Sequence, residues 1–167
     1  DLVAGKFAAD SLVIAGTPGE VTDALMPHFA EMERSSLLAM LNEEAAQAPQ
    51  QPAVPLRPLL EGFRAQNIAL GVATNDSEVP ARAHLGAAGI TDLFVFIAGY
   101  DSAHGGKPAP GQLLAFAKAV GLEPAQIAMV GDSTHDLHAG RAAGMRTIAV
   151  LTGTAVTAQL APFADVV

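Results

Sequence analysis

The stretch IAMVGDSTHD, residues 127–136, decides the fold of this chain. Its first four residues form a short apolar run typical of a buried strand, and a helical pattern follows from about Thr134 to Ala143 and stops at Gly144. Asp132 stands between the two, where the predicted strand ends. A buried strand that leads directly into a helix is one unit of an α/β fold.

The same succession of strand and helix recurs on both sides of this stretch. The apolar runs are short, and Gly89 and Gly121 follow two further helical patterns as stop signals. Apolar strands that alternate with helices predict an α/β fold with a Rossmann-like, doubly wound parallel sheet that is covered on both faces. The predicted strands span residues 68–74, 93–98, 127–130, 147–151 and 164–167, and the further predicted helices span 76–88 and 110–120.

The chain before residue 66 has a different pattern. A helical pattern covers residues 21–47, with apolar residues on one side, and is interrupted near Pro27. Prolines then recur at every third position from 49 to 58, a period that matches polyproline II and predicts a stiff linker. We therefore expect a small helical lobe over 4–56, a proline-rich linker over 49–58 and an α/β core over 57–167.

Composition and charge exclude several classes of protein. Half of the 167 residues are hydrophobic and 16% are charged, which argues against intrinsic disorder and coiled coils. The formal net charge of −8 argues against binding a nucleic-acid backbone, and no apolar run approaches the roughly 20 residues of a membrane helix. The absence of cysteine excludes disulfides and thiolate metal sites. With no signal-peptide pattern at its start, the chain is expected to be soluble and cytoplasmic, without membrane or nucleic-acid partners.

Polar side chains gather where three predicted strands end. Thr74 and Asn75 follow the first strand, a loop with Lys107 follows the second, and Asp132 follows the third, with Asp136 four residues later. Ligands of a doubly wound parallel sheet bind beyond the carboxyl ends of its strands, so these side chains are expected to surround one pocket. A hydroxyl near a helix start, a flexible cation and two carboxylates together suit a phosphate and Mg²⁺.

Each of these residues alone has a simpler explanation. A threonine at a strand end is commonly a cap, a loop lysine is usually solvated, and acids at a helix start are favoured by the helix dipole. Their joint order at three successive strand ends favours a shared site. The histidines are expected to be structural or near the surface, because their spacing does not repeat in a metal-binding pattern.

Three motifs are specific when they are taken together: Gly71-Val72-Ala73-Thr74-Asn75, Gly106-Lys107-Pro108-Ala109-Pro110 and VGDSTHDL at residues 130–137. With shorter matches at 139–140, 142–144 and 164–167, they resemble the haloacid dehalogenase superfamily, and within it the phosphoglycolate-phosphatase-like branch. The resemblance runs from about Pro55 to the end of the sequence, and the helical lobe resembles the cap that these enzymes carry.

The resemblance implies a role for each residue. Thr74 and Asn75 would hold the phosphate, Lys107 would contact the phosphate and the nucleophile, and Asp132 would bind Mg²⁺. Asp136 would support both the metal and Lys107, and Thr74, Lys107 and Asp136 would be the catalytic group. The resemblance thus implies a Mg²⁺-dependent phosphomonoester hydrolase that acts on a small phosphorylated metabolite through an aspartyl-phosphate intermediate.

One family motif, Asp-x-Asp-Gly-Thr, which supplies the nucleophile and the general acid/base, is absent from the sequence. Two interpretations stay open: residues 1–3 begin the core's first strand, or residues 1–5 resemble the stretch beyond a motif further upstream. The family's first strand is central in its sheet, and its loss would expose apolar neighbours and strand edges. We therefore favour a piece of a longer protein over an evolved loss.

Two other functions compete with hydrolysis. If the protein truly lacks the nucleophile motif, the alternative is a non-catalytic relative that binds a phosphate or a partner. A signalling receiver domain also uses carboxylates, Thr and Lys around Mg²⁺, but its acidic residues come first in the chain. Here Asp132 and Asp136 come last, which disfavours the receiver.

Overall fold

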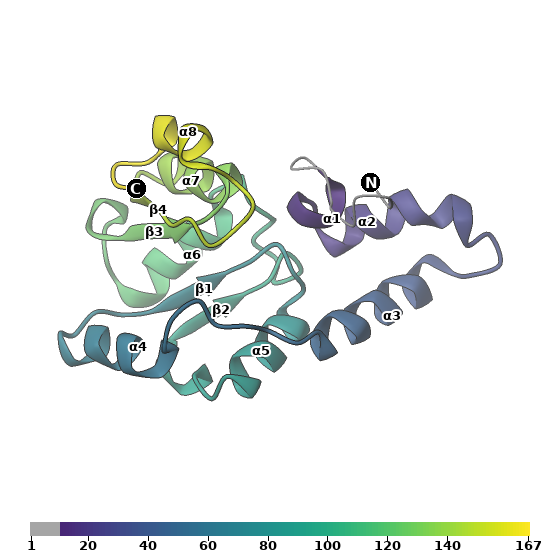
Figure 1. Cartoon of the computed structure of the whole chain (residues 1–167), viewed down its shortest axis with the longest axis horizontal. Helices are drawn as coiled ribbons and strands as arrows, with labels where there is room; N and C mark the ends of the chain where they lie inside the picture. The colour runs from purple at the N-terminus through teal and green to yellow at the C-terminus, as the bar shows by residue number, and fades with distance from the viewer. Residues whose placement is uncertain (1–10) are drawn as a thin grey trace.

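The computed structural model describes residues 11–167 and shows a mixed α/β architecture (Figure 1). The prediction for residues 1–3 lies outside the described residues. The strands are β1 (Gly71–Ala73), β2 (Phe96–Ala98), β3 (Ala128–Gly131) and β4 (Arg146–Ala149). The helices are α1 (Leu12–Ala15), α2 (Pro18–Leu25), α3 (Arg34–Gln47), α4 (Leu56–Ala65), α5 (Glu78–Ala87), α6 (Gly111–Val120), α7 (Thr134–Ala142) and α8 (Thr157–Leu160).

The strands form two parallel pairs, whereas the sequence predicted a single sheet. In the pair β1–β2, Val72 lies opposite Ile97, and in the pair β3–β4, Val130 lies opposite Ile148. Figure 1 shows the order β4, β3, β1, β2, with β3 and β1 as inner strands. Within residues 11–167, no backbone hydrogen bond joins β1 to β3. The α/β class with parallel strands is confirmed, but the sheet is divided into two halves.

The predicted strand over residues 164–167 shrinks to a single parallel bridge between Ile148 and Val166. The side chain of Asp165 explains this local structure, because its Oδ2 accepts a hydrogen bond of 2.8 Å from the backbone N–H of Thr147. A carboxylate therefore occupies a position that a ladder carbonyl would fill in a regular strand.

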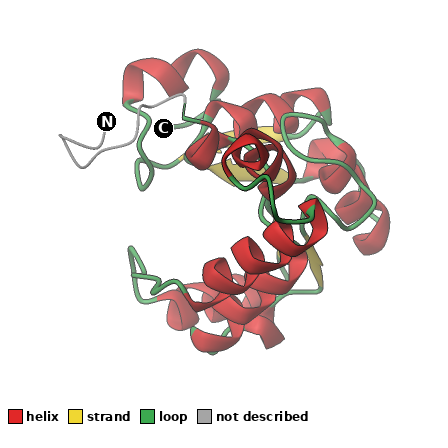
Figure 2. Ribbon diagram, turned by 90° about the vertical axis from the view of Figure 1, so that its right-hand side faces the viewer, coloured by secondary structure: helices red, strands yellow, loops and turns green. Residues whose placement is uncertain are grey.

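Helix α6 holds the two strand pairs together on one face. Its Leu113 and Ala117 share a hydrophobic cluster with Ala139 of α7. Ala73 of β1 and Met129 of β3 pack against the same cluster. Figure 2 shows helices surrounding the strands. Burial of these apolar side chains, rather than a continuous hydrogen-bond ladder, connects the halves of the core.

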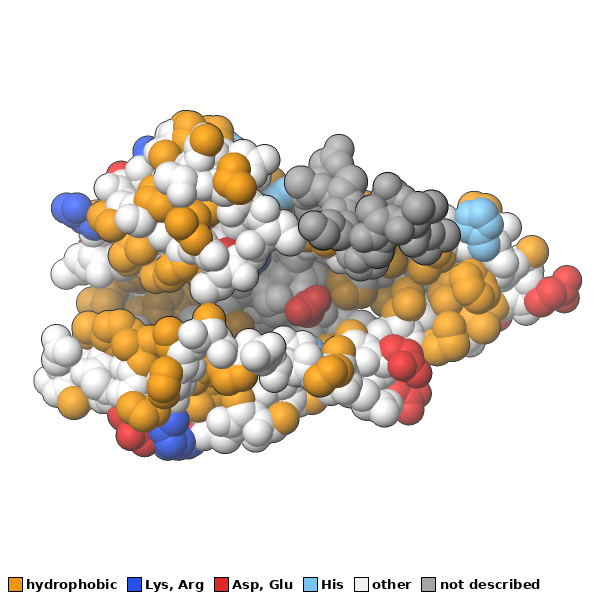
Figure 3. Space-filling model, in the orientation of Figure 1, with side chains coloured by type: hydrophobic (Ala, Val, Ile, Leu, Met, Phe, Trp, Pro, Cys, Tyr) orange, Lys and Arg blue, Asp and Glu red, His pale blue; other side chains and the backbone are white. Residues whose placement is uncertain are grey.

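The opposite face of the strand pairs is open. Val130 of β3 is 53% exposed, although it lies within a parallel strand. Figure 3 shows a hollow with hydrophobic atoms along it, between the part that holds β3 and β4 and the part that holds β1 and β2. Parallel strands are normally covered on both faces, so this face differs from the predicted covered sheet.

Helices α2 and α3 pack together, and α3 lies beside α5. Arg34 of α3 forms an ion pair with Asp23 of α2, and Leu37 is fully buried. Ser77, the residue before α5, donates a hydrogen bond of 2.8 Å to Asn42 of α3. The predicted interruption near Pro27 is confirmed, because α2 ends at Leu25 and α3 begins only at Arg34. The limits of the proposed lobe and core stay predictions.

The proline-rich segment is shorter than predicted, because α4 begins at Leu56 and includes Pro58. Proline is tolerated in the first turn of a helix, where a backbone N–H has no partner within the helix. The linker predicted over 49–58 therefore ends in a helix. None of the helices in residues 11–167 has the length and hydrophobicity needed to cross a lipid bilayer.

Candidate active site

The start of α7 is fixed by a reciprocal cap. Ser133 Oγ accepts a hydrogen bond from the backbone N–H of Asp136, while Asp136 Oδ2 accepts bonds from the backbone N–H and the hydroxyl of Ser133 at 3.1 and 2.7 Å. This capping box gives Asp136 one orientation at the carboxyl end of β3. Sequence reasoning missed Ser133, although its spacing of three residues from Asp136 is the signal for such a cap.

Lys107 reaches the same carboxylate from a different part of the chain. Its Nζ lies 2.6 Å from Asp136 Oδ1, and the two side chains are only 12% and 8% exposed. Both carboxylate oxygens of Asp136 thus have hydrogen-bond donors, Lys107 on one and Ser133 on the other. These contacts indicate that Asp136 orients the side chain of Lys107. A role of Asp136 as a metal ligand stays a prediction.

Asn75 holds the backbone of the Lys107 loop. Its side-chain amide donates a hydrogen bond of 2.9 Å to the Lys107 carbonyl and accepts one of 2.7 Å from the Lys107 N–H. The two bonds fix the position of the loop relative to the end of β1. Asn75 therefore has a positioning role in addition to the phosphate contact that the family resemblance implies.

Thr74 directly follows β1, and its hydroxyl accepts a hydrogen bond of 3.0 Å from the N–H of Asp76. The carbonyl of Thr74 accepts a bond of 2.9 Å from the side-chain amide of Gln112, which is fully buried. Gln112 was not identified from the sequence. A glutamine in the first turn of a helix carries no pattern that distinguishes this buried contact from ordinary surface polarity.

Asp132 follows β3, and its Oδ2 accepts a hydrogen bond of 3.1 Å from the hydroxyl of Thr152. The loop after β4 lies so close that a Cβ on Gly153 would be 2.7 Å from the Asp132 Cγ. Only glycine fits this approach without displacing the carboxylate.

The donor chemistry of Asp132 fits Mg²⁺, which takes oxygen ligands and binds proteins through one or two carboxylates, completing its shell with water and phosphate oxygens. Among residues 11–167, no group of three or more His, Cys, Asp or Glu side chains could hold a metal ion. A metal at Asp132 would therefore depend on water, substrate and further oxygen ligands.

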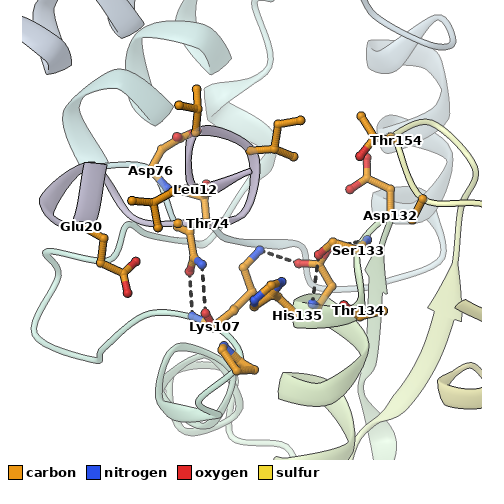
Figure 4. Close-up of a pocket in the computed structure, with 18 of the residues that line it drawn as sticks. Leu12, Glu20, Thr74, Asp76, Lys107, Asp132, Ser133, Thr134, His135 and Thr154 are labelled. Atoms are coloured by element: carbon orange, nitrogen blue, oxygen red, sulfur yellow. Dashed lines mark hydrogen bonds and ion pairs between the residues drawn. The ribbon is translucent and has the colours of Figure 1, made fainter. Parts of the chain in front are cut away.

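The structure brings all five predicted residues to one cavity of about 760 Å³. They converge from the ends of β1 and β3, the loop after β2 and the first turn of α7 (Figure 4). Their roles in catalysis stay predictions. The shared cavity is lined by Thr74, Asn75, Lys107, Asp132 and Asp136.

One further wall of the cavity comes from α1 and α2, and another comes from the loop after β4 and from α8, with Thr154 and Gln159. Leu12, Val13 and Ile14 contribute apolar side chains, and Glu20 contributes a carboxylate. Sequence reasoning did not identify Glu20. The signal was the spacing of Thr17 and Glu20, which form a second capping box.

Hydrogen bonds from Thr17, first from its backbone N–H and then from its hydroxyl, lower the pKa of Glu20 below its ordinary value. The nearby His135 acts in the same direction, while partial burial opposes both. Glu20 is therefore ionised at neutral pH. The histidines predicted to be structural or near the surface include His138, whose ring packs on Phe163, and His84, whose Nε2 lies 2.8 Å from the Ala45 carbonyl.

The comparisons with known proteins agree with this geometry. The model of the family described as haloacid dehalogenase-like hydrolase matches residues 15–150. A protein of Dickeya dadantii named "Probable phosphatase IndB" is 37% identical over 115 residues, which are 67% of this chain and 50% of that protein. A phosphoglycolate phosphatase of Rhodospirillum rubrum is 39% identical over 95 residues, 57% of this chain and 39% of that enzyme.

A solved structure is also similar. It belongs to a protein described as a predicted phosphoglycolate phosphatase from Haemophilus somnus, with a TM-score of 0.67 and 26% identity over 81% of this chain and 64% of that one. The chain spans about half the length or less of the two sequence relatives. The family model covers most of the chain, and the α/β fold, the motif order and the shared pocket agree with it. This chain belongs to the haloacid dehalogenase-like hydrolase family.

Proposed function

We propose that the protein is a phosphatase that binds the phosphate group of a small monoester in the cavity described above. The observation that carries this proposal is the meeting of Thr74, Lys107 and Asp132 in one cavity, although they are far apart in the sequence. A hydroxyl donor, a cation and a carboxylate available for a metal are the groups that recognition of a phosphate dianion requires.

Lys107 is the group that offsets charge in this proposal. Its ammonium is mostly buried and is held by Asp136, so it is already oriented before a ligand binds. A preorganised cation in a partly water-excluded site stabilises the charge that develops during phosphoryl transfer more effectively than a mobile one. Thr74 would add a hydroxyl donor to the same phosphate.

Asp132 would hold the Mg²⁺ ion that the family resemblance implies. When bound, the ion would supply positive charge to the phosphate oxygens. The hydrogen bond from Thr152 and the close approach of Gly153 limit the rotation of the Asp132 side chain. These contacts prepare the carboxylate for a ligand on the cavity side.

The nucleophile has to come from a segment beyond the motifs identified in this sequence. The family resemblance implies a central strand for it. Among residues 11–167, β1 pairs with β2 and β3 with β4, and the facing edges of β1 and β3 are compatible with such a strand between them. In the proposed reaction, a carboxylate oxygen attacks phosphorus and the bond to the ester oxygen breaks, so that the alcohol leaves with a proton from the general acid. Water then cleaves the aspartyl-phosphate and releases phosphate.

The test is hydrolysis of p-nitrophenyl phosphate by the full-length protein, with and without Mg²⁺. Lys107→Ala and Asp132→Asn are each expected to lower kcat/KM by about 100-fold or more, because each removes charge stabilisation from the transition state. Lys118→Ala is the matched control, since this exposed lysine on α6 is not among the residues that line the cavity. Unchanged rates in both site variants contradict the proposal.

The non-catalytic alternative is supported by the absence of the Asp-x-Asp-Gly-Thr motif from the sequence. Calorimetric titration with inorganic phosphate and Mg²⁺ separates the two functions. Binding that Lys107→Ala abolishes, together with no turnover by the full-length protein, favours a phosphate-binding relative.

A further inference from the structure

The cavity also contains a carboxylate, that of Glu20, on its α1–α2 side. Figure 4 shows the side chain of Glu20 at the side of the cavity away from Asp132, with Lys107 and His135 between them. The rest of this wall is formed by Leu12, Val13 and Ile14 of α1. A ligand whose phosphate lies near Lys107 therefore meets an apolar surface and one carboxylate on the α1–α2 side.

Glu20 is held in place by its own helix cap. The backbone N–H and the hydroxyl of Thr17 donate hydrogen bonds of 2.7 and 3.0 Å to Oε2. Among the hydrogen bonds of residues 11–167, Oε1 takes part in none, so it is available as an acceptor. Two bonds on one oxygen restrict the side chain and leave the other oxygen for a ligand.

Contact between α2 and the Lys107 loop sets the position of the Glu20 carboxylate relative to Lys107, where the phosphate is proposed to bind. A Cβ on Gly106 would lie 3.2 Å from Thr17 Cγ2, so the start of α2 rests against the loop that carries Lys107. Gly19 of α2 also lies against Tyr100, with a Cβ position 3.5 Å from the ring. Glu20 and Lys107 are thus positioned by parts of the chain that touch each other.

The charge of Glu20 is fixed as well. The hydrogen bonds from Thr17 hold the pKa of this carboxyl below its ordinary value, so the group is anionic when the ligand is a phosphate dianion. A ligand that carries a second anionic group would place that group near the carboxylate, and like charges in a partly enclosed cavity repel each other.

We propose that Glu20 selects the alcohol part of the phosphate ester. It favours small esters that carry a hydroxyl or ammonium group and disfavours those that carry a carboxylate or a second phosphate. This inference rests on the proposed phosphatase function, because it assumes that the phosphate lies at Lys107. It separates this chain from a phosphoglycolate-type specificity, since phosphoglycolate carries a carboxylate beside its phosphate.

The experiment compares two-carbon esters that share one phosphate and differ only at the other end. Aminoethyl, hydroxyethyl and ethyl phosphate and phosphoglycolate are titrated calorimetrically into the full-length protein in a low-salt buffer with Mg²⁺. We expect phosphoglycolate to bind about tenfold more weakly than aminoethyl phosphate in the wild type. Added salt should narrow this difference, because the carboxylate is exposed to solvent.

Three variants isolate the contribution of Glu20. Glu20→Gln keeps an acceptor for the Thr17 cap and is expected to reduce the difference to about twofold, while Glu20→Lys is expected to reverse the order of the two ligands. Glu44→Gln changes an exposed glutamate on α3 that is not among the cavity-lining residues, and it should preserve the full tenfold difference. Thermal unfolding of each variant checks that it is folded.

Two outcomes overturn the inference and differ in what they say of the phosphatase proposal. If the esters bind and Glu20→Gln leaves the tenfold difference between aminoethyl phosphate and phosphoglycolate unchanged, the selection by Glu20 is wrong and the phosphate site stands. If neither inorganic phosphate nor any ester binds the wild type, the proposed phosphatase site fails and this inference fails with it.

Discussion

On the β3–α7 side of the cavity, Lys107 and Asp136 are 12% and 8% exposed and hold each other in an ion pair. On the α1–α2 side, Val13 is 58% exposed and Glu20 is open to solvent. A buried ion pair whose carboxylate has hydrogen-bond donors on both oxygens fixes charges in space and is costly to change. The exposed residues of the α1–α2 side tolerate substitution. Changes there can alter which ligand binds, while the Lys107–Asp136 pair keeps its geometry.

The strongest test of this comparison is Lys107→Met. Removal of the ammonium leaves the Asp136 carboxylate buried without its cationic partner, so we expect the free energy of unfolding to fall by about 2–4 kcal/mol. Urea denaturation followed by circular dichroism measures the change. Lys118→Met, on the exposed side of α6, should change the free energy of unfolding by less than about 0.5 kcal/mol. An equal effect of both variants would show that the buried Lys107–Asp136 pair contributes no more to stability than an exposed lysine.

The contact between the two sides is tested by Gly106→Ala. The new methyl group would lie 3.1 Å from Asn75 Oδ1 and 3.2 Å from Thr17 Cγ2, so one of these neighbours has to move. We expect a loss of about 1 kcal/mol in the free energy of unfolding and a weaker preference among the phosphate esters.

Gly62→Ala is the matched control for this substitution. Gly62 lies within α4, and a Cβ there would meet no atom within 4 Å. Alanine is the better helix former, so this variant should gain about 0.5–1 kcal/mol. A gain in stability for Gly106→Ala as well would mean that α2 does not rest on the Lys107 loop.

The smallest effect is expected for the pH dependence of the contribution that Glu20 makes to the free energy of unfolding. The Thr17 cap lowers the pKa of this carboxyl, so its contribution to stability is present above its unfolded-state pKa and is lost as the pH falls through the lower folded-state pKa. Because the group is solvent-exposed, we expect Glu20→Gln to differ from the wild type by only about 0.5 kcal/mol near pH 7.

This difference should vanish in acid, once the carboxyl is protonated in both the folded and the unfolded protein. Chemical denaturation at a series of pH values follows it. A difference that persists in acid would point to the shape of the side chain rather than to its charge.

The order of the elements was predictable because it depends on local patterns. Apolar runs, glycine stops and helix starts correctly indicated β1, β2, β3 and β4 with shifted ends, and α5, α6 and α7 within one or two residues. The convergence of Thr74, Lys107 and Asp132 was predictable for the same reason, since a parallel topology brings strand ends to one edge. The segment over 164–167 failed as a strand because the Asp165 side chain takes one of the ladder bonds.

The sequence by itself determined the α/β class and the charged groups that meet beyond the strands, because periodicity and strand order set these features, and its three motifs carried the resemblance to the family. Only the tertiary structure decided that the strands form two halves, that buried Gln112 supports Thr74 and that Glu20 faces the cavity. These features depend on contacts between residues far apart in the chain. A glutamine or glutamate has the same identity in a sequence whether it lies in solvent or against a binding site, and only packing separates the two.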